Sequence, residues 1–204
     1  MSPATINLAV ANKAGQPDGF EAWFSQSKVV RPDGSPCVVY HGTNADVSCF
    51  DPAMMGTSVD NPTTRFGFYF SADPDDAGNW ASRAVRRGMQ SIPNIIPVYL
   101  RIENPVYLNA EKFLYYLQKA RVRTIDSHLA AWKKKGHDGI VAVRGEKQWF
   151  VAFSPTQTKS AIGNSGAYDL NDPEITDRKA LGLKALAFVS NAPFHAVVLR
   201  RKLP

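Results

Sequence analysis

Hydrophobic and polar positions along the chain follow two patterns, one typical of strands and one typical of helices. Short apolar runs between turn-forming residues predict strands, and apolar residues three and four apart predict helices. Strands are predicted in a hairpin at 28–40 that runs on to residue 43, and at 67–71, 95–102, 140–143 and 149–153. Helices are predicted at 21–27, 73–88, 109–121, 125–135 and 177–188. Because several strands follow one another as hairpins, the order predicts an α+β fold with a largely antiparallel sheet.

Two segments lack a regular hydrophobic period. Residues 44–65 are rich in glycine, proline, asparagine and aspartate, which predicts a long irregular loop. Loops of this length inside a compact domain tend to carry function. Residues 1–18 are polar and rich in alanine, and we expect them to form a flexible leader.

The composition is that of a globular protein with one domain. Of the 204 residues, 44% are hydrophobic and 21% are charged, a balance typical of foldable chains. The sequence has neither a run approaching the ~20 apolar residues of a membrane span nor a secretory signal. Its two cysteines, Cys37 and Cys49, lack metal-ligand spacing and suit a reducing compartment. We therefore expect a monomer without a membrane partner, in the cytoplasm or delivered into a target cell's cytoplasm.

The net charge is +6, with basic clusters at 83–87, 133–135 and 200–202. A basic balance favours contact with nucleic acid, acidic proteins or membrane surfaces. The alternative is a solvated face that keeps the protein in solution. The clusters are not interleaved with aromatic residues, as a platform for nucleic acid would be, and this favours the alternative.

Residues that could carry chemistry occur in separated motifs. They are 41–43 (His-Gly-Thr, at a strand end), 67–71 (Gly-Phe-Tyr-Phe-Ser), Trp80, and the strand 149–153 with the segment 154–161 behind it. Each has an ordinary structural explanation when taken alone, because aromatic residues suit half-buried strands and helices. Their order and spacing together point to a function.

In this order the motifs resemble the ADP-ribosyltransferases of the diphtheria-toxin and poly(ADP-ribose) polymerase type, whose signature is His, Tyr and a third residue that is often Glu. The likeness extends to the small transferase domains of phage polyvalent proteins and bacterial toxins. Motifs similar to theirs stand at 23–30, 38–43 and 157–161. The resemblance covers residues 19–174 and leaves 175–204 as a C-terminal extension. It implies a split, mostly antiparallel sheet with flanking helices and an NAD cleft.

The resemblance assigns His41, Gly42 and Thr43 to one side of the NAD site. Splitting the nicotinamide–ribose bond creates an oxocarbenium-like ribose, so the enzyme must orient the ribose, fix the carboxamide and exclude water. The resemblance implies that His41 contacts a ribose hydroxyl and that the Gly42 backbone holds the carboxamide, where a missing Cβ allows close approach. Thr43 would orient His41 or help to close the site.

Aromatic residues would flank the nicotinamide ring. The resemblance implies that Tyr69 and Trp80 form the two plates, with Phe70 and Ser71 completing the NAD-binding surface. Relatives often carry a hydroxyl three residues before the second plate, where this chain has Ala77. Ser71 is the nearby hydroxyl that would take that role.

The third catalytic position has two candidates. An ungapped match puts Trp149 where relatives have Glu. A Glu would hydrogen-bond the ribose 2′-hydroxyl and stabilise the developing positive charge. Gln148 offers only the hydrogen bond, whereas Glu146 offers both if the hairpin turn bulges inward. Because alternation along a strand sends Gln148 and Trp149 to opposite faces, both cannot point at NAD without a bulge.

The resemblance implies a mono-ADP-ribosyltransferase that cleaves NAD without a metal, releases nicotinamide and modifies a macromolecule, as a phage or bacterial effector or toxin. A catalytically silent NAD or ADP-ribose reader and an NAD glycohydrolase stay open as alternatives. An RNA 2′-phosphotransferase shares the fold but needs several pocket arginines, which the sequence does not place. The chain has no Glu-x-Glu pair, which weighs against an arginine acceptor. Protein and nucleic acid both stay open as acceptors.

Overall fold

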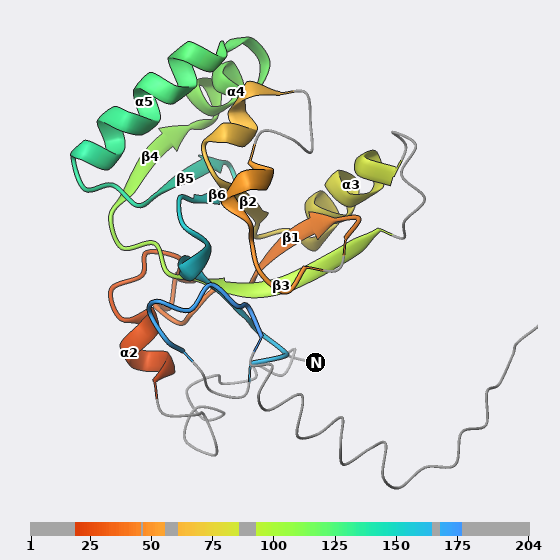
Figure 1. Cartoon of the computed structure of the whole chain (residues 1–204), viewed down its shortest axis with the longest axis vertical. Coiled ribbons are helices and arrows are strands. Elements are labelled where there is room, and N and C mark those ends of the chain that lie inside the picture. The colour runs from red at the N-terminus through yellow and green to blue at the C-terminus, as the bar shows by residue number, and fades with distance from the viewer. Residues whose placement is uncertain (1–18, 46, 56–60, 86–92, 165–167, 177–204) are drawn as a thin grey trace, which may run out of the picture.

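One seven-stranded sheet organises the chain (Figure 1). The structure is a computed structural model that describes residues 19–45, 47–55, 61–85, 93–164 and 168–176. The strand order is β4-β5-β6-β2-β1-β3-β7, and of the paired neighbours only β4 and β5 run parallel in these residues. The strands are β1 (Val39–Thr43), β2 (Phe68–Ser71), β3 (Asn94–Leu100), β4 (Pro105–Asn109), β5 (Gly139–Arg144), β6 (Lys147–Ala152) and β7 (Thr158–Ser160). The predicted α+β fold with a largely antiparallel sheet is confirmed.

Helices lie at both ends of this sheet. Figure 1 shows α4 and α5 together near β4, and α2 near the opposite end. The α-helices are α2 (Phe20–Phe24), α3 (Pro74–Val85), α4 (Ala110–Lys119) and α5 (Val122–Lys134). Short 3₁₀ helices are η1 (Pro52–Met54), η2 (Pro62–Arg65) and η3 (Pro155–Gln157). No helix in the described ranges is long and apolar enough to cross a membrane.

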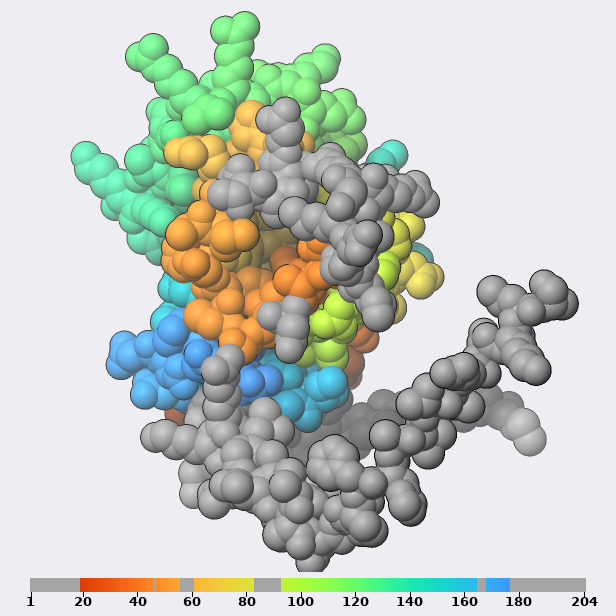
Figure 2. All heavy atoms as spheres, turned by 45° about the vertical axis from the view of Figure 1, so that its right-hand side comes forward, coloured from red at the N-terminus to blue at the C-terminus, as the bar shows by residue number. Residues whose placement is uncertain are grey.

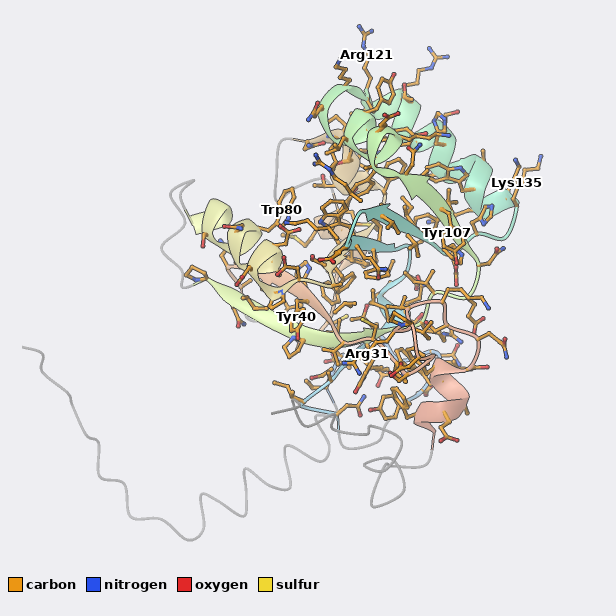
Figure 3. All side chains as sticks on the ribbon, turned by 180° about the vertical axis from the view of Figure 1, so that it is seen from behind. Arg31, Tyr40, Trp80, Tyr107, Arg121 and Lys135 are labelled. Atoms are coloured by element: carbon orange, nitrogen blue, oxygen red, sulfur yellow. The ribbon has the colours of Figure 1, made fainter. Side chains whose placement is uncertain are left out.

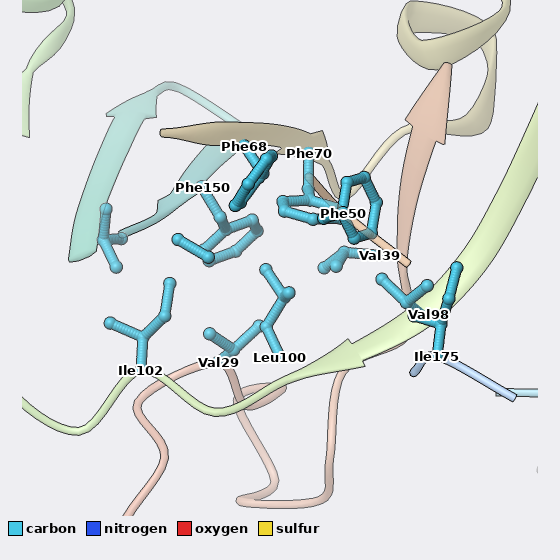
Figure 4. Packing of buried hydrophobic residues seen from close by; sticks show 12 residues of the cluster. Val29, Val39, Phe50, Phe68, Phe70, Val98, Leu100, Ile102, Phe150 and Ile175 are labelled. Carbon is cyan, nitrogen blue, oxygen red and sulfur yellow. The ribbon is translucent and has the colours of Figure 1, made fainter. Parts of the chain in front are cut away.

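Alternation along the strands gives the sheet two buried faces. Phe68, Phe70 and Phe150 pack with Phe50 on one face, which we call the phenylalanine core (Figure 4). The opposite face, the helix-side core, joins Val151 of β6 to residues of β4, β5, α4 and α5. Each fully buried Phe, Ile or Leu stabilises the fold by roughly 1.5–3 kcal/mol, so both faces hold the sheet in one register.

Several predicted elements differ in extent from the structure. The helix predicted at 21–27 ends at Phe24, because Ser25 has a positive φ of 33°. The first arm of the predicted hairpin at 28–40 is reduced to one bridge, Val30 opposite Pro36. The helix predicted at 125–135 begins earlier, at Val122.

The hydrophobic pattern predicted neither β4 nor the short strand β7. Pro105 follows the strand predicted at 95–102, and it begins a further strand that pairs with β5. A proline is tolerated there because the first residue of an edge strand need not donate a backbone N–H to the sheet. Asn109 then caps α4 by accepting a hydrogen bond from the Lys112 N–H at 2.9 Å.

The predicted loop at 44–65 is irregular in its described part, where η1 and η2 are its helical turns. Predictions for 1–18, 86–88 and 177–188 lie outside the described residues. The first two residues of the predicted extension at 175–204 are described. Of these, Ile175 is buried in the phenylalanine core.

Candidate active site

Strand β1 separates from β2 within the His-Gly-Thr motif. The two strands pair at Tyr40 opposite Ser71, whereas the pairing of β1 with β3 continues as far as Thr43 opposite Asn94. From His41 onward β1 is therefore paired on one side only, as far as the described residues show. Seen as a surface, the face where β1 meets the start of β3 is hollowed (Figure 2). A ligand could meet backbone groups of β1 at this point.

His41 lies where the strands separate and is held as a neutral imidazole. Its Nδ1 is 2.8 Å from the carbonyl oxygen of Tyr69. Because a carbonyl oxygen only accepts, Nδ1 must carry the proton. Burial lowers the pKa of His41, although the hydrogen bond to Tyr69 opposes this effect. The remaining nitrogen, Nε2, is thus a hydrogen-bond acceptor, which suits a hydroxyl group of a ligand.

Aromatic rings fix the orientation of the His41 imidazole. The ring centroid of Phe50 lies 4.8 Å away, at an interplanar angle of 90°, and that of Phe70 lies 5.5 Å away. Phe70 is itself buried in the phenylalanine core. Phe70, which was predicted to bind NAD, therefore packs against the His41 ring from the buried side.

Gly42 brings helix α3 against β1. A Cβ built on Gly42 would lie 1.8 Å from the carbonyl oxygen of Ala77 and 2.7 Å from its carbonyl carbon. Only glycine allows this approach, because the obstacle is backbone that cannot rotate away. The space freed by the missing Cβ is occupied by α3, so a ligand would meet Gly42 through its backbone groups. Thr43 Oγ1 accepts from the Ala45 N–H at 3.1 Å, which turns the chain after β1.

Tyr69 lies on the helix side of the sheet, opposite to its neighbours Phe68 and Phe70. Its hydroxyl donates to the carbonyl oxygen of Thr63 at 2.7 Å, and its ring packs 6.4 Å from that of Phe113. Burial raises the pKa of Tyr69 far above its ordinary value, so the phenol stays protonated. The ring is therefore anchored at both of its ends.

Two further predicted residues frame α3. Ser71 is buried, and its Oγ accepts from the Asp73 N–H at 3.1 Å just before α3 begins. Trp80 is 43% exposed and lies on the side of α3 that faces the β5–β6 hairpin (Figure 3). The structure thus collects the predicted residues 41–43, 69–71 and 80 around β1, β2 and α3.

Neither candidate for the third position is buried. Strand β6 keeps an unbroken register with β2 and β5, so the bulge that would swing Glu146 inward is not present in this hairpin. Glu146 is exposed in a two-residue turn, where Gly145 adopts the positive φ of 58° typical of such turns. Gln148 is partly exposed on the face opposite to Trp149.

Trp149, which the ungapped match puts at the third position, contacts a carboxylate. It lies opposite Ser71, and its ring stacks on Phe113 with centroids 5.8 Å apart. Its indole Nε1 donates to Asp76 Oδ2 at 2.9 Å. The other carboxylate oxygen of Asp76 accepts from Lys147 Nζ at 3.2 Å. Asp76 therefore lies beside the strand position that carries Glu in the families that the chain resembles.

Sequence reasoning missed Asp76, because the run Asp73-Pro74-Asp75-Asp76 is also a typical helix start. The available signal was its spacing. Asp76 is four residues before Trp80, so both lie on one face of α3. An acid on the same helix face as a predicted nicotinamide plate could have been singled out.

The segment at 157–161 is a structural motif. The side-chain amide of Gln157 donates to the carbonyl oxygens of Arg101 and Asp138. Buried Lys159 donates to the carbonyl oxygens of Asp172 and Glu174 at 2.9 and 2.8 Å. Burial lowers the pKa of Lys159. These bonds join β7 to the segment 168–176 and place no reactive group near His41.

Within the described ranges, no group of three His, Cys, Asp or Glu side chains is arranged to hold a metal ion. Cys37 and Cys49 are free thiols, and burial raises the pKa of both. The groups described at β1 and α3 include the imidazole of His41, the aromatic rings and the carboxylate of Asp76.

The comparisons with known proteins bear on the same elements. A family model described as ADP-ribosyltransferase in polyvalent proteins matches residues 32–168, which is more than half of the chain. No curated protein and no solved structure matches the chain. The match includes β1, β2, α3 and β6, the elements that hold His41, Tyr69, Asp76 and Trp149. The chain belongs to the family of ADP-ribosyltransferases in polyvalent proteins.

Proposed function

We propose that the chain is a mono-ADP-ribosyltransferase that uses NAD as its co-substrate. It cleaves the bond between nicotinamide and ribose, and transfers ADP-ribose to a macromolecular acceptor. The family indicates the class of reaction. The observation that carries the proposal is the state of His41, a neutral imidazole whose Nδ1 is committed to Tyr69 and whose Nε2 is an acceptor.

The residues present fit the demands of this reaction. His41 Nε2 accepts a hydrogen bond from a ribose hydroxyl, and the backbone of Gly42 binds the carboxamide where β1 leaves β2. Tyr69 and Trp80 lie on the helix side, where they flank the nicotinamide ring. His41 faces the phenylalanine core, so an extended dinucleotide reaches both groups at the point where the strands separate. Holding NAD in this way lowers the entropic cost of reaching the transition state.

In the reaction, the electron pair of the broken bond leaves with nicotinamide and the ribose becomes an oxocarbenium-like cation. A nucleophilic atom of the acceptor then forms the new bond to the same ribose carbon and gives up its proton to solvent. The residues of the chain bind and orient NAD and exclude water from the site. Nicotinamide leaves as an uncharged ring.

A second function is favoured by one observation. The ungapped match puts Trp149 at the third position, and Glu146 is exposed in the hairpin turn. A protein that binds NAD or ADP-ribose without turnover would need no acid there. The two functions differ in whether nicotinamide is released.

The test is transfer of label from NAD that is labelled in its adenylate part, incubated with the protein and a bacterial lysate. Separate portions are then treated with protease and with nuclease. We expect label in macromolecules, lost in the His41→Ala and Tyr69→Ala variants, and the enzyme that removes it identifies the acceptor as protein or nucleic acid. NAD binding without incorporation would instead support the silent reader, and free ADP-ribose alone would support an NAD glycohydrolase. An effector or toxin role follows only if a host component is the acceptor.

A further inference from the structure

We infer that Asp76 of α3 supplies the carboxylate that β6 lacks, and that it stabilises the positive charge on the ribose when nicotinamide leaves. This inference rests on the proposed function. It names the acid of that site and assigns it to a helix, where the resemblance expected it on a strand.

The first step concerns the contacts of Asp76 itself. Trp149 Nε1 donates to Oδ2 at 2.9 Å and Lys147 Nζ donates to Oδ1 at 3.2 Å. Lys147 and Trp149 are two residues apart in β6 and therefore point to the same face. Each carboxylate oxygen has two lone pairs, so these bonds fix the orientation of Asp76 and leave acceptor capacity on both oxygens.

The second step concerns the position of Asp76 in the site. The next residue, Ala77, has its carbonyl oxygen against Gly42, which is adjacent to His41. Trp80 follows Asp76 by four residues on the same helix face. Asp76 therefore belongs to the turn of α3 that lies on Gly42, and it shares a helix face with the ring that would stack on nicotinamide. The bond that breaks joins that ring to the ribose.

The third step compares Asp76 with the other carboxylates of this region. The side chain of Asp76 is 19% exposed, so it is shielded and still reachable. Glu146 and Asp75 are exposed, and Asp73 Oδ2 is 4.0 Å from Lys147 Nζ with no shorter contact to β6 among the described bonds. A shielded, oriented carboxylate stabilises a developing cation more strongly than a solvated one, because water screens the latter.

The chemical role needs no covalent step on Asp76. Its carboxylate accepts a hydrogen bond from a ribose hydroxyl and faces the oxocarbenium-like carbon. The electron pair still leaves with nicotinamide, and the acceptor still forms the new bond. Asp76 lowers the barrier by electrostatic stabilisation alone, an effect worth roughly 100-fold or more in kcat for a single preorganised group.

The experiment compares Asp76→Asn with Asp75→Asn in the full chain. Both variants remove one negative charge from the first turn of α3, and Asn at 76 can still accept from Trp149. Three quantities are measured for each: the melting temperature, the Kd for NAD, and kcat for nicotinamide release. We expect Asp76→Asn to bind NAD within about threefold of wild type and to lose about 100-fold in kcat, with Asp75→Asn unchanged.

Further variants separate catalysis from structure. Trp149→Phe and Lys147→Gln each remove one partner of Asp76 but keep its carboxylate. If Asp76 is merely structural, their losses of melting temperature and kcat will match those of Asp76→Asn, and the inference is overturned. Should Asp76→Asn fold poorly, Asp76→Glu restores the charge and is expected to restore the fold with a smaller loss of kcat.

The remaining outcomes discriminate between the two proposals. Wild-type turnover that survives in Asp76→Asn but not in Glu146→Gln would assign the acid to the hairpin turn and overturn the inference, while the proposed function stands. A wild-type protein that binds NAD and releases no nicotinamide would overturn the proposed function and the inference with it.

Discussion

On the β1 side of the site, Gly42 lies against the backbone of α3 with no side chain between them, whereas on the β6 side Trp149 reaches α3 through an indole N–H. The first contact tolerates no added atom, because Ala77 presents a carbonyl group there. The second is made by side chains that can move and be replaced. Gly42 therefore sets the position of α3 on β1, whereas the side chains of β6 orient the carboxylate of Asp76.

The largest expected effect breaks the backbone contact. Gly42→Ala places a methyl group where the Ala77 carbonyl stands, and we expect it to lower the free energy of unfolding by about 3 kcal/mol, the upper part of the overpacking range. Gly78→Ala is the matched control on α3, since its Cβ would meet only Ile95 Cδ1 at 3.4 Å. Urea unfolding of both variants gives the comparison. Equal stability of the two would contradict the close contact.

A smaller effect is expected on the β6 side. Trp149→Phe keeps a ring on Phe113 but removes the N–H that Asp76 Oδ2 accepts. We expect a loss of about 1.5 kcal/mol in unfolding free energy, because the hydrogen bond goes to a charged group that is mostly buried. Lys147→Gln, at an exposed site, is expected to cost less than about 0.5 kcal/mol. A Trp149→Phe protein as stable as wild type would mean that the hydrogen bond between Trp149 and Asp76 does not contribute to the free energy of unfolding.

Tyr69 lies between the two sides and tests whether its ring or its hydroxyl matters. Tyr69→Phe removes the bond to the Thr63 carbonyl and is expected to cost about 1 kcal/mol of stability. The ring stays, so nicotinamide release should remain within about threefold of wild type. Loss of turnover in Tyr69→Phe with NAD binding intact would instead give the phenol a catalytic role.

The dependence of stability on pH probes the β1 side without altering its packing. Burial lowers the pKa of His41 from its ordinary value of 6.5. Below about pH 6.5, His41 therefore takes up a proton in the unfolded chain before it does so in the folded protein. The contribution of His41 to stability is therefore fully present above this pH. It is lost as pH falls toward the pKa of His41 in the folded protein. His41→Asn keeps a donor for the Tyr69 carbonyl but cannot titrate, so its stability should fall less between pH 7 and pH 5. Parallel curves for the two proteins would contradict the lowered pKa.

The smallest effect is expected at the hairpin turn. Glu146→Gln changes an exposed side chain outside both contacts, so stability should change by less than about 0.5 kcal/mol and nicotinamide release should stay at the wild-type level. Thermal melting and a turnover assay check the two expectations. A large loss of turnover would return Glu146 to the third position.

The sequence predicted one side of the site better than the other for a physical reason. His41, Gly42 and Tyr69 lie in short strands whose apolar runs are strong local signals, so the pattern placed them in strands, whereas their proposed roles came from the resemblance. The contact between Trp149 and Asp76 joins residues 73 positions apart. It depends on how α3 packs on β1, which brings Asp76 within reach of β6 and which no local period records. Strand β4 was not predicted for a similar reason. A proline usually ends a strand, and Pro105 is acceptable in β4 only because it lies at the edge of the sheet.

The most direct test of the central claim is the amount of nicotinamide released from NAD by the purified protein with lysate, measured with the label bound to macromolecules in the same sample. We expect wild type to release nicotinamide in step with bound label and His41→Ala to do neither. Wild-type protein that binds NAD but leaves it intact, or variants that turn NAD over as fast as wild type, would contradict it.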